Sequence, residues 1–146
     1  MSTTAKIRAF NRYYTTVIGI LDKNYLESDY SLTEVRIMYE LNAHPEGITA
    51  KDLNEILHVD KGYLSRLLAI LAKKKLIKKQ QLKIDKRAFN LVLTERGFGI
   101  FKTLDAKSEE QVAHLLKGLT TRQSQQLVLH MQAIEDILQK HLLING

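Results

Sequence analysis

The chain has 146 residues, 45% of them hydrophobic, with one proline, seven glycines, no cysteine and a net charge of +6. This composition excludes a disordered chain, and the lack of cysteine excludes disulfides, thiolate metal sites and thiol redox sensing. No segment approaches the ~18 apolar residues that a membrane-spanning helix needs. We therefore expect one mainly α-helical cytoplasmic domain covering residues 1–146, with no membrane partner.

Two helices are predicted before residue 44. Residues 5–27 carry apolar side chains at steps of three and four, which is close to a coiled-coil pattern and predicts lengthwise packing on other helices. Ser31 and Glu34 form a capping box, which predicts that a second helix begins there. Pro45 and Gly47 then indicate a turn.

The next two predicted helices are short and separated by about three residues. Thr49 is the expected N-cap of the first, and Asp60 of the second. In the second helix one face is apolar, with Leu64, Leu67, Leu68 and Leu71. Two short helices in this order, the second with polar groups facing outward, indicate a helix-turn-helix. A helical hairpin without a ligand is the alternative.

A two-stranded hairpin, or wing, is predicted directly after these helices. Leu76 and Ile77 begin a strand, residues 80–86 form a polar turn, and Phe89, Leu91 and Leu93 are expected to share the buried face of the second strand. The fold expected for residues 31–94 is therefore a winged helix. Residues 61–87 hold ten Lys or Arg and one acid, a net charge of +9, so the basic charge of the chain is confined to this motif. That concentration predicts double-stranded DNA as the partner.

The outward residues of the basic helix are the first candidate DNA contacts. Arg66 can form a bidentate pair with a guanine edge, and no acid lies three or four residues from it. Lys61, Tyr63 and Ser65 are expected mostly to bind phosphate.

The wing tip supplies the other candidate contacts. Arg87 is expected to enter a minor groove, with Asp85 holding its guanidinium group. Lys83 and Lys86 flank this pair. An ordinary surface ion pair between Arg87 and Asp85 is the alternative.

Residues 95–143 are predicted to form two long helices, both with near-heptad apolar stripes. The last helix carries Leu127, Met131, Ile134 and Leu138. Since one chain of this size cannot cover three such stripes, we expect a homodimer formed by residues 5–27 and 95–143. An intramolecular bundle beside the winged helix is the alternative.

The sequence was also searched for effector, metal and catalytic sites. Tyr13, Tyr14, Tyr30 and Tyr39 could line a pocket for a small aromatic effector, although core and interface positions are the simpler interpretation. The five histidines lack metal-ligand spacing, so no metal or cofactor is expected. No nucleophile–base pair or phosphate loop is present, and the chain is not expected to be an enzyme. A helical protein-interaction module and a metal-responsive regulator remain the alternative functions.

Three local patterns, in order, resemble the MarR family of bacterial transcriptional regulators. They are the segment Lys61–Leu67, the triplet Asp85-Lys86-Arg87, and the segment Leu93–Gly97. The resemblance covers essentially the whole chain and implies a homodimer that binds a pseudo-palindromic operator, most simply as a repressor, with a small-molecule effector that could release it. The first helix and the segment 60–68 are also similar to the regulator half of MarR–acetyltransferase fusions. Lys75 stands where the family usually has a glycine, so we expect either a strained lysine or a different turn.

Overall fold

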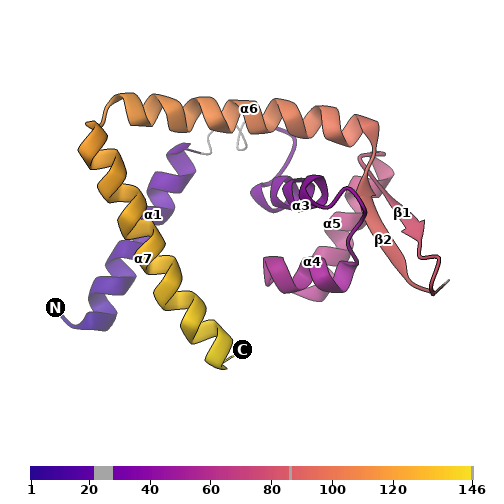
Figure 1. Ribbon diagram of the computed structural model, residues 1–146, viewed down its shortest axis with the longest axis horizontal. Coiled ribbons are helices and arrows are strands. Elements are labelled where there is room, and N and C mark those ends of the chain that lie inside the picture. Colours follow the sequence, from indigo (N-terminus) through magenta and orange to yellow (C-terminus); the bar gives the residue numbers. More distant parts are fainter. Residues whose placement is uncertain (22–27, 86, 146) are drawn as a thin grey trace. The chain divides into compact units, whose positions relative to one another are not determined.

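The computed structural model describes residues 1–21, 28–85 and 87–145. These residues form, in order, α1 (Thr3–Leu21), α3 (Leu32–Ala43), α4 (Ala50–Leu57), α5 (Lys61–Lys73), β1 (Ile77–Gln81), β2 (Phe89–Leu93), α6 (Glu95–Lys117) and α7 (Thr121–Asn145) (Figure 1). The expected mainly helical fold with a two-stranded wing is confirmed. The chain divides into two compact units, Met1–Ser108 and Glu109–Gly146.

Side-chain caps begin the helices where the sequence predicts them. Ser31 Oγ accepts a hydrogen bond from the Glu34 amide at 3.2 Å, and Glu34 Oε1 accepts one from the Ser31 amide at 3.1 Å. Thr49 Oγ1 accepts from the Asp52 amide at 3.1 Å. Each cap satisfies amides that the first helical turn leaves unpaired. The expected extension of the first helix to residue 27 falls on residues 22–27, which lie outside the described part of the chain.

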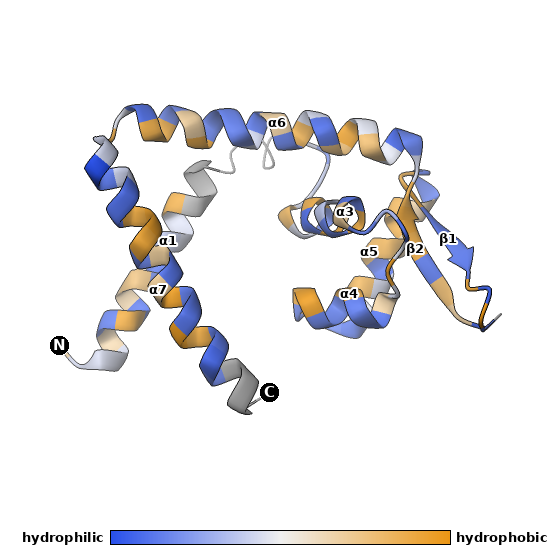
Figure 2. Ribbon diagram, in the orientation of Figure 1, coloured by the Kyte–Doolittle hydropathy of each residue, from blue (hydrophilic) through white to orange (hydrophobic). Residues whose placement is uncertain are grey.

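The core of the first unit lies between α3, α4, α5 and the base of the wing. Its completely buried large side chains are Ile37, Met38, Leu41, Leu53, Leu71 and Leu76. The four leucines predicted to form the inner face of α5 are all buried. In Figure 2 α5 and β2 carry orange, hydrophobic bands, whereas β1 is blue and hydrophilic. This packing fixes which side of α5 remains outside.

The wing is an antiparallel pair in which Ile77 lies opposite Leu93 and Gln81 opposite Phe89. Ile48 adds a short bridge on the other side of β2, where the Leu91 amide donates to the Ile48 carbonyl at 2.8 Å. The expected alternation is wrong for Phe89, which is 46% exposed, whereas the adjacent Leu91 and Val92 are both buried. Both faces of β2 are covered near its base, so burial there does not follow a period of two.

The junction between the wing and α6 is tightly packed. Lys75 adopts a left-handed conformation with φ 62°, so the lysine at the family's usual glycine position takes the strained turn. Thr94 Oγ1 donates to the Lys75 carbonyl at 2.6 Å, and the Thr94 amide donates to the Leu76 carbonyl at 3.0 Å. A Cβ built on Gly97 would overlap the Leu76 carbonyl oxygen. The first turn of α6 therefore lies directly against the backbone at the start of β1.

The second unit contains the end of α6 and all of α7. Thr120 and Gln123 form a capping box, with hydrogen bonds of 3.0 and 3.1 Å. Residues 121–141 contain no buried side chain, and the predicted stripe of Leu127, Met131, Ile134 and Leu138 is 36–54% exposed. Among the described helices, none is long and apolar enough to cross a membrane.

Candidate nucleic-acid interface

Helix α5 presents a polar surface opposite its buried leucines. Asp60 is its N-cap and accepts a hydrogen bond from the Tyr63 amide at 3.0 Å. The candidate contacts Lys61, Tyr63, Ser65 and Arg66 are all exposed. All four side chains that the sequence predicts on the outside of this helix are therefore free of the core.

Arg66 lies along the helix toward its N-terminus. A Cβ built on Gly62 would be 3.4 Å from Nη1 of Arg66, so the guanidinium group lies over the glycine. Long helical side chains point toward the preceding turn, and a glycine there leaves room for the head group. This places a planar five-donor group at the N-terminal, outward end of α5, which suits a base edge or a phosphate.

The turn between α4 and α5 is held by Asn54, a residue that the sequence interpretation did not single out. His58 adopts a left-handed conformation with φ 53°, and its amide donates to the Asn54 carbonyl at 2.8 Å. The Asn54 side-chain oxygen accepts from the Val59 amide at 3.3 Å. Asn54 thus accepts two hydrogen bonds from the turn, and these bonds fix the angle between α4 and α5. Only the position of Asn54 in the last turn before the loop could have indicated this role.

The wing tip is a small hydrogen-bonded turn. Asp85 Oδ1 accepts from the Arg87 amide at 3.0 Å and lies 4.0 Å from Nε of the same residue. The Arg87 side chain is 97% exposed, so the carboxylate orders the backbone more than it restrains the guanidinium group. Lys83 is also exposed. Lys86, the remaining predicted contact, lies outside the described residues.

Positive charge covers the same surface. Nine of the ten basic residues between 61 and 87 are described, and all nine are exposed. Lys74 lies 4.8 Å from the centre of the Tyr30 ring, so that lysine is partly engaged within the protein. The others provide cations along α5 and β1 to the wing tip.

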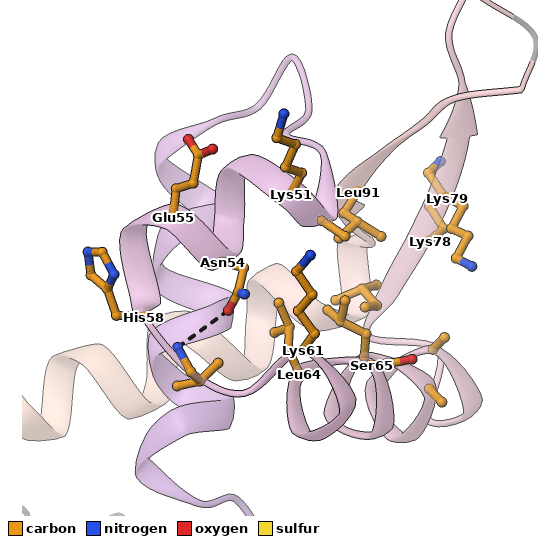
Figure 3. A pocket seen from close by; sticks show the side chains of 16 residues that line it. Lys51, Asn54, Glu55, His58, Lys61, Leu64, Ser65, Lys78, Lys79 and Leu91 are labelled. Carbon is orange, nitrogen blue, oxygen red and sulfur yellow. Dashed lines mark hydrogen bonds between the residues drawn. The ribbon is translucent and has the colours of Figure 1, made fainter. Parts of the chain in front are cut away.

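A groove of about 980 Å³ lies between α4, α5 and the wing (Figure 3). Leu64, Leu68, Ile77 and Leu91 form its floor. Its charged lining consists of Lys51, Lys61, Lys78, Lys79 and Glu55, which leaves a surplus of cations. Figure 3 shows Lys61 and Ser65 on its rim, so the groove belongs to the same surface as the predicted DNA contacts. Lys51 was not foreseen as part of this surface.

The four tyrosines of the predicted effector pocket have different recorded neighbours. Tyr14 stacks on Phe10 with ring centres 5.6 Å apart, Tyr39 meets Phe101 edge-on at 6.2 Å, and Tyr30 lies beneath Lys74. Tyr13 and Tyr39 are exposed, while Tyr14 and Tyr30 are half-buried. An effector pocket formed by these residues stays a prediction. The described residues include no cluster of His, Asp or Glu able to hold a metal ion.

Comparison with known proteins gives a family match over the winged helix. The model of the MarR family matches residues 30–89. No curated protein matches the chain. The matched family and the structural neighbours are transcription regulators rather than enzymes, as the sequence predicts for this chain. The likeness to acetyltransferase fusions has no support among these matches and stays a prediction.

Solved structures of similar fold extend over nearly the whole chain. FabT from Streptococcus pneumoniae in complex with DNA has a TM-score of 0.80 at 18% identity, covering 95% of this chain and 99% of that one. A mutant of MarR from E. coli complexed with operator DNA has a TM-score of 0.74 at 22% identity, with 92% and 99% covered. A mutant of MepR from S. aureus has a TM-score of 0.73 at 21% identity, with 94% and 99% covered. At these identities the likeness establishes the fold.

Proposed function

We propose that this chain is a DNA-binding transcriptional regulator of the MarR winged-helix type. It binds a pseudo-palindromic operator as a homodimer in the cytoplasm and represses the genes it controls. The observation that carries the proposal is the surface described above, where exposed cations run along α5 and β1 to the wing tip and Arg66 extends from the outward face of α5. Two of the three similar structures named above contain DNA, which supports this choice of partner.

Each subunit would place α5 in the major groove and the wing over the neighbouring minor groove. In α5, Arg66 would read a base, while Lys61, Tyr63 and Ser65 would contact the backbone. The groove beside α5 adds Lys51, Lys78 and Lys79 to the cations that can follow the phosphates. At the wing tip, Arg87 with Lys83, Asp85 and Lys86 would meet the minor groove, whose negative potential attracts arginine.

The homodimer is inferred from the apolar side chains that the single chain leaves uncovered. A 25-residue helix with an exposed stripe is not stable by itself in water, because most helix stability comes from packing of an apolar face. Exposed Ile7 and Phe10 of α1 and Val112 and Leu115 of α6 supply further apolar surface. Dimerisation through residues 5–27 and 95–143 would bury these side chains. It would also present two recognition helices to the two halves of a palindrome.

Release by a small aromatic effector is part of the proposal. Tyr14 and Tyr30 are half-buried and offer rings with polar ends, which suits a ligand that has an aromatic body and a polar group. Titration of the protein–DNA complex with aromatic carboxylates would test this step. If no compound lowers the affinity, repression without an effector is the simpler function.

Binding-site selection from a random DNA library, followed by a salt titration on the recovered site, tests the function. A regulator should select a two-fold symmetric site. Its affinity should fall steeply with salt, because each neutralised phosphate contributes about −0.9 to the slope of log affinity against log salt concentration. The exposed stripe of α7 favours a second candidate, a helical protein-interaction module. That module would recover no symmetric site and would show little salt dependence.

A further inference from the structure

The tip of the wing carries one apolar side chain that the proposed contacts do not use. Ile84 is 101% exposed, as open to solvent as in an extended peptide. The next most exposed leucine or isoleucine among the described residues is Ile137, at 69%, and it lies on α7, which the proposed dimer would cover. Ile84 stands instead between Lys83 and Asp85, in the most basic part of the chain. Its exposure is therefore not explained by the proposed dimer.

The backbone around Ile84 is fixed by hydrogen bonds. The Leu82 amide donates to the Ala88 carbonyl at 3.0 Å, and the Ala88 amide donates to the Asp85 carbonyl at 3.0 Å. Asp85 Oδ1 also accepts from the Arg87 amide at 3.0 Å. These bonds extend the hairpin beyond the last strand pair and close the turn. Described residues on both sides of Ile84 are thus joined by hydrogen bonds.

We infer that Ile84 is a further DNA contact, an apolar side chain that inserts at a base step in the minor groove beneath the wing. The inference rests on the proposed function and adds a source of sequence preference to it. Lys83 would hold the tip against the phosphates, Arg87 would enter the minor groove as proposed above, and Ile84 would lie beside it, against sugars and base edges. Apolar side chains inserted in this way partly unstack the bases and kink the duplex.

Insertion of Ile84 predicts which base steps the protein should prefer beneath the wing. Pyrimidine–purine steps such as TA and CA unstack most easily, so the free energy of insertion is lowest there. Removing a fully exposed isoleucine from water favours insertion by a factor of about ten or more. The selected sites should therefore contain a flexible step beneath the wing, at a position that no hydrogen-bonding side chain reads.

The test is parallel binding-site selection with the wild type, Ile84→Ser, Ile84→Leu and Lys83→Gln. Ile84→Ser should recover the same central sequence, bind sites with a flexible step about tenfold more weakly, and so lose the preference for them. It should keep the wild-type salt slope, since no charge has changed. Ile84→Leu should restore the preference. Lys83→Gln should keep the preference and reduce the salt slope. Because Ile84 is fully exposed, its replacement should leave the thermal unfolding midpoint unchanged.

A second readout detects the unstacking directly. A 2-aminopurine base placed at the step beneath the wing should fluoresce more when the wild type binds, and not when Ile84→Ser binds. Equal flanking preference in the wild type and Ile84→Ser, or no fluorescence change with the wild type, would overturn the inference while the proposed function stands. If the wild type selects no sequence at all, the proposed function fails and this inference fails with it.

Discussion

Replacing Gly97 with alanine should destabilise the protein even though the residue is in a helix. The added Cβ would overlap the Leu76 carbonyl oxygen and lie 2.9 Å from its carbonyl carbon, so the start of β1 must move. Two hydrogen bonds from Thr94, to the carbonyls of Leu76 and Lys75, depend on that backbone. Each is worth about 0.5–1.5 kcal/mol, and a buried carbonyl left unpaired costs about 1–3 kcal/mol. The higher helix propensity of alanine offsets about 1 kcal/mol of this loss.

The net loss of unfolding free energy should thus be about 2 kcal/mol, which lowers the urea midpoint by about 1 M for a slope near 2 kcal/mol per molar. Gly99 is a matched control on the same helix, because a Cβ there meets no atom within 4 Å. Gly99→Ala should raise stability by about 0.5–1 kcal/mol. Urea unfolding of both variants by circular dichroism, at one protein concentration, measures the two effects. If Gly97→Ala is as stable as Gly99→Ala, the close approach of α6 to β1 is not as described.

The remaining predictions concern DNA binding, the dimer and backbone strain. Arg66→Ala should cost about 1–3 kcal/mol on the selected site and relax base preference; equal losses on selected and random DNA would show a phosphate contact only. Arg87→Ala should weaken binding most on sites with A·T-rich flanks, where the minor groove is narrow, and the claim fails if flanking sequence has no influence on the loss. Ile134→Asp would bury an unpaired charge in the proposed interface, so light scattering should show monomers and DNA affinity should collapse; a dimer with full affinity would contradict the interface. Lys75→Gly should raise the unfolding free energy by about 1 kcal/mol by relieving the left-handed lysine, as measured by urea unfolding.

The helices and their faces could be predicted because the signals that specify them are local. Asp60, Ser31 and Thr49 cap helices within three residues of themselves, and their hydrogen bonds are formed as expected. The leucine spacing of α5 likewise determines its buried face, so the exposure of Arg66 follows from the sequence. The order of the elements and the cluster of charge then point to a winged helix.

Features that depend on distant parts of the chain could not be predicted. Ile48 pairs with Leu91 across more than forty residues, and this bridge alters the burial of β2. The left-handed turn at His58 is stabilised by Asn54, which carries no sequence signature of that role. Lys51 joins the basic surface only because α4 packs beside α5. The exposure of Ile84 could not be predicted from its residue type, because an isoleucine is usually expected to be buried.

Residues 121–141 contain no buried side chain, and this affects how the stability of the protein depends on its concentration in the cell. With a second copy covering that helix, folding and assembly become one equilibrium, and the stability of the protein depends on how many copies the cell contains. Each tenfold dilution would remove about 1.4 kcal/mol per dimer. At low copy number the separated chains would expose this long helix and its apolar stripe to proteases, so a low concentration would accelerate degradation. The proposed repressor would then disappear more sharply than its rate of synthesis declines, and the genes proposed to be under its control would be switched on over a narrow range of its expression.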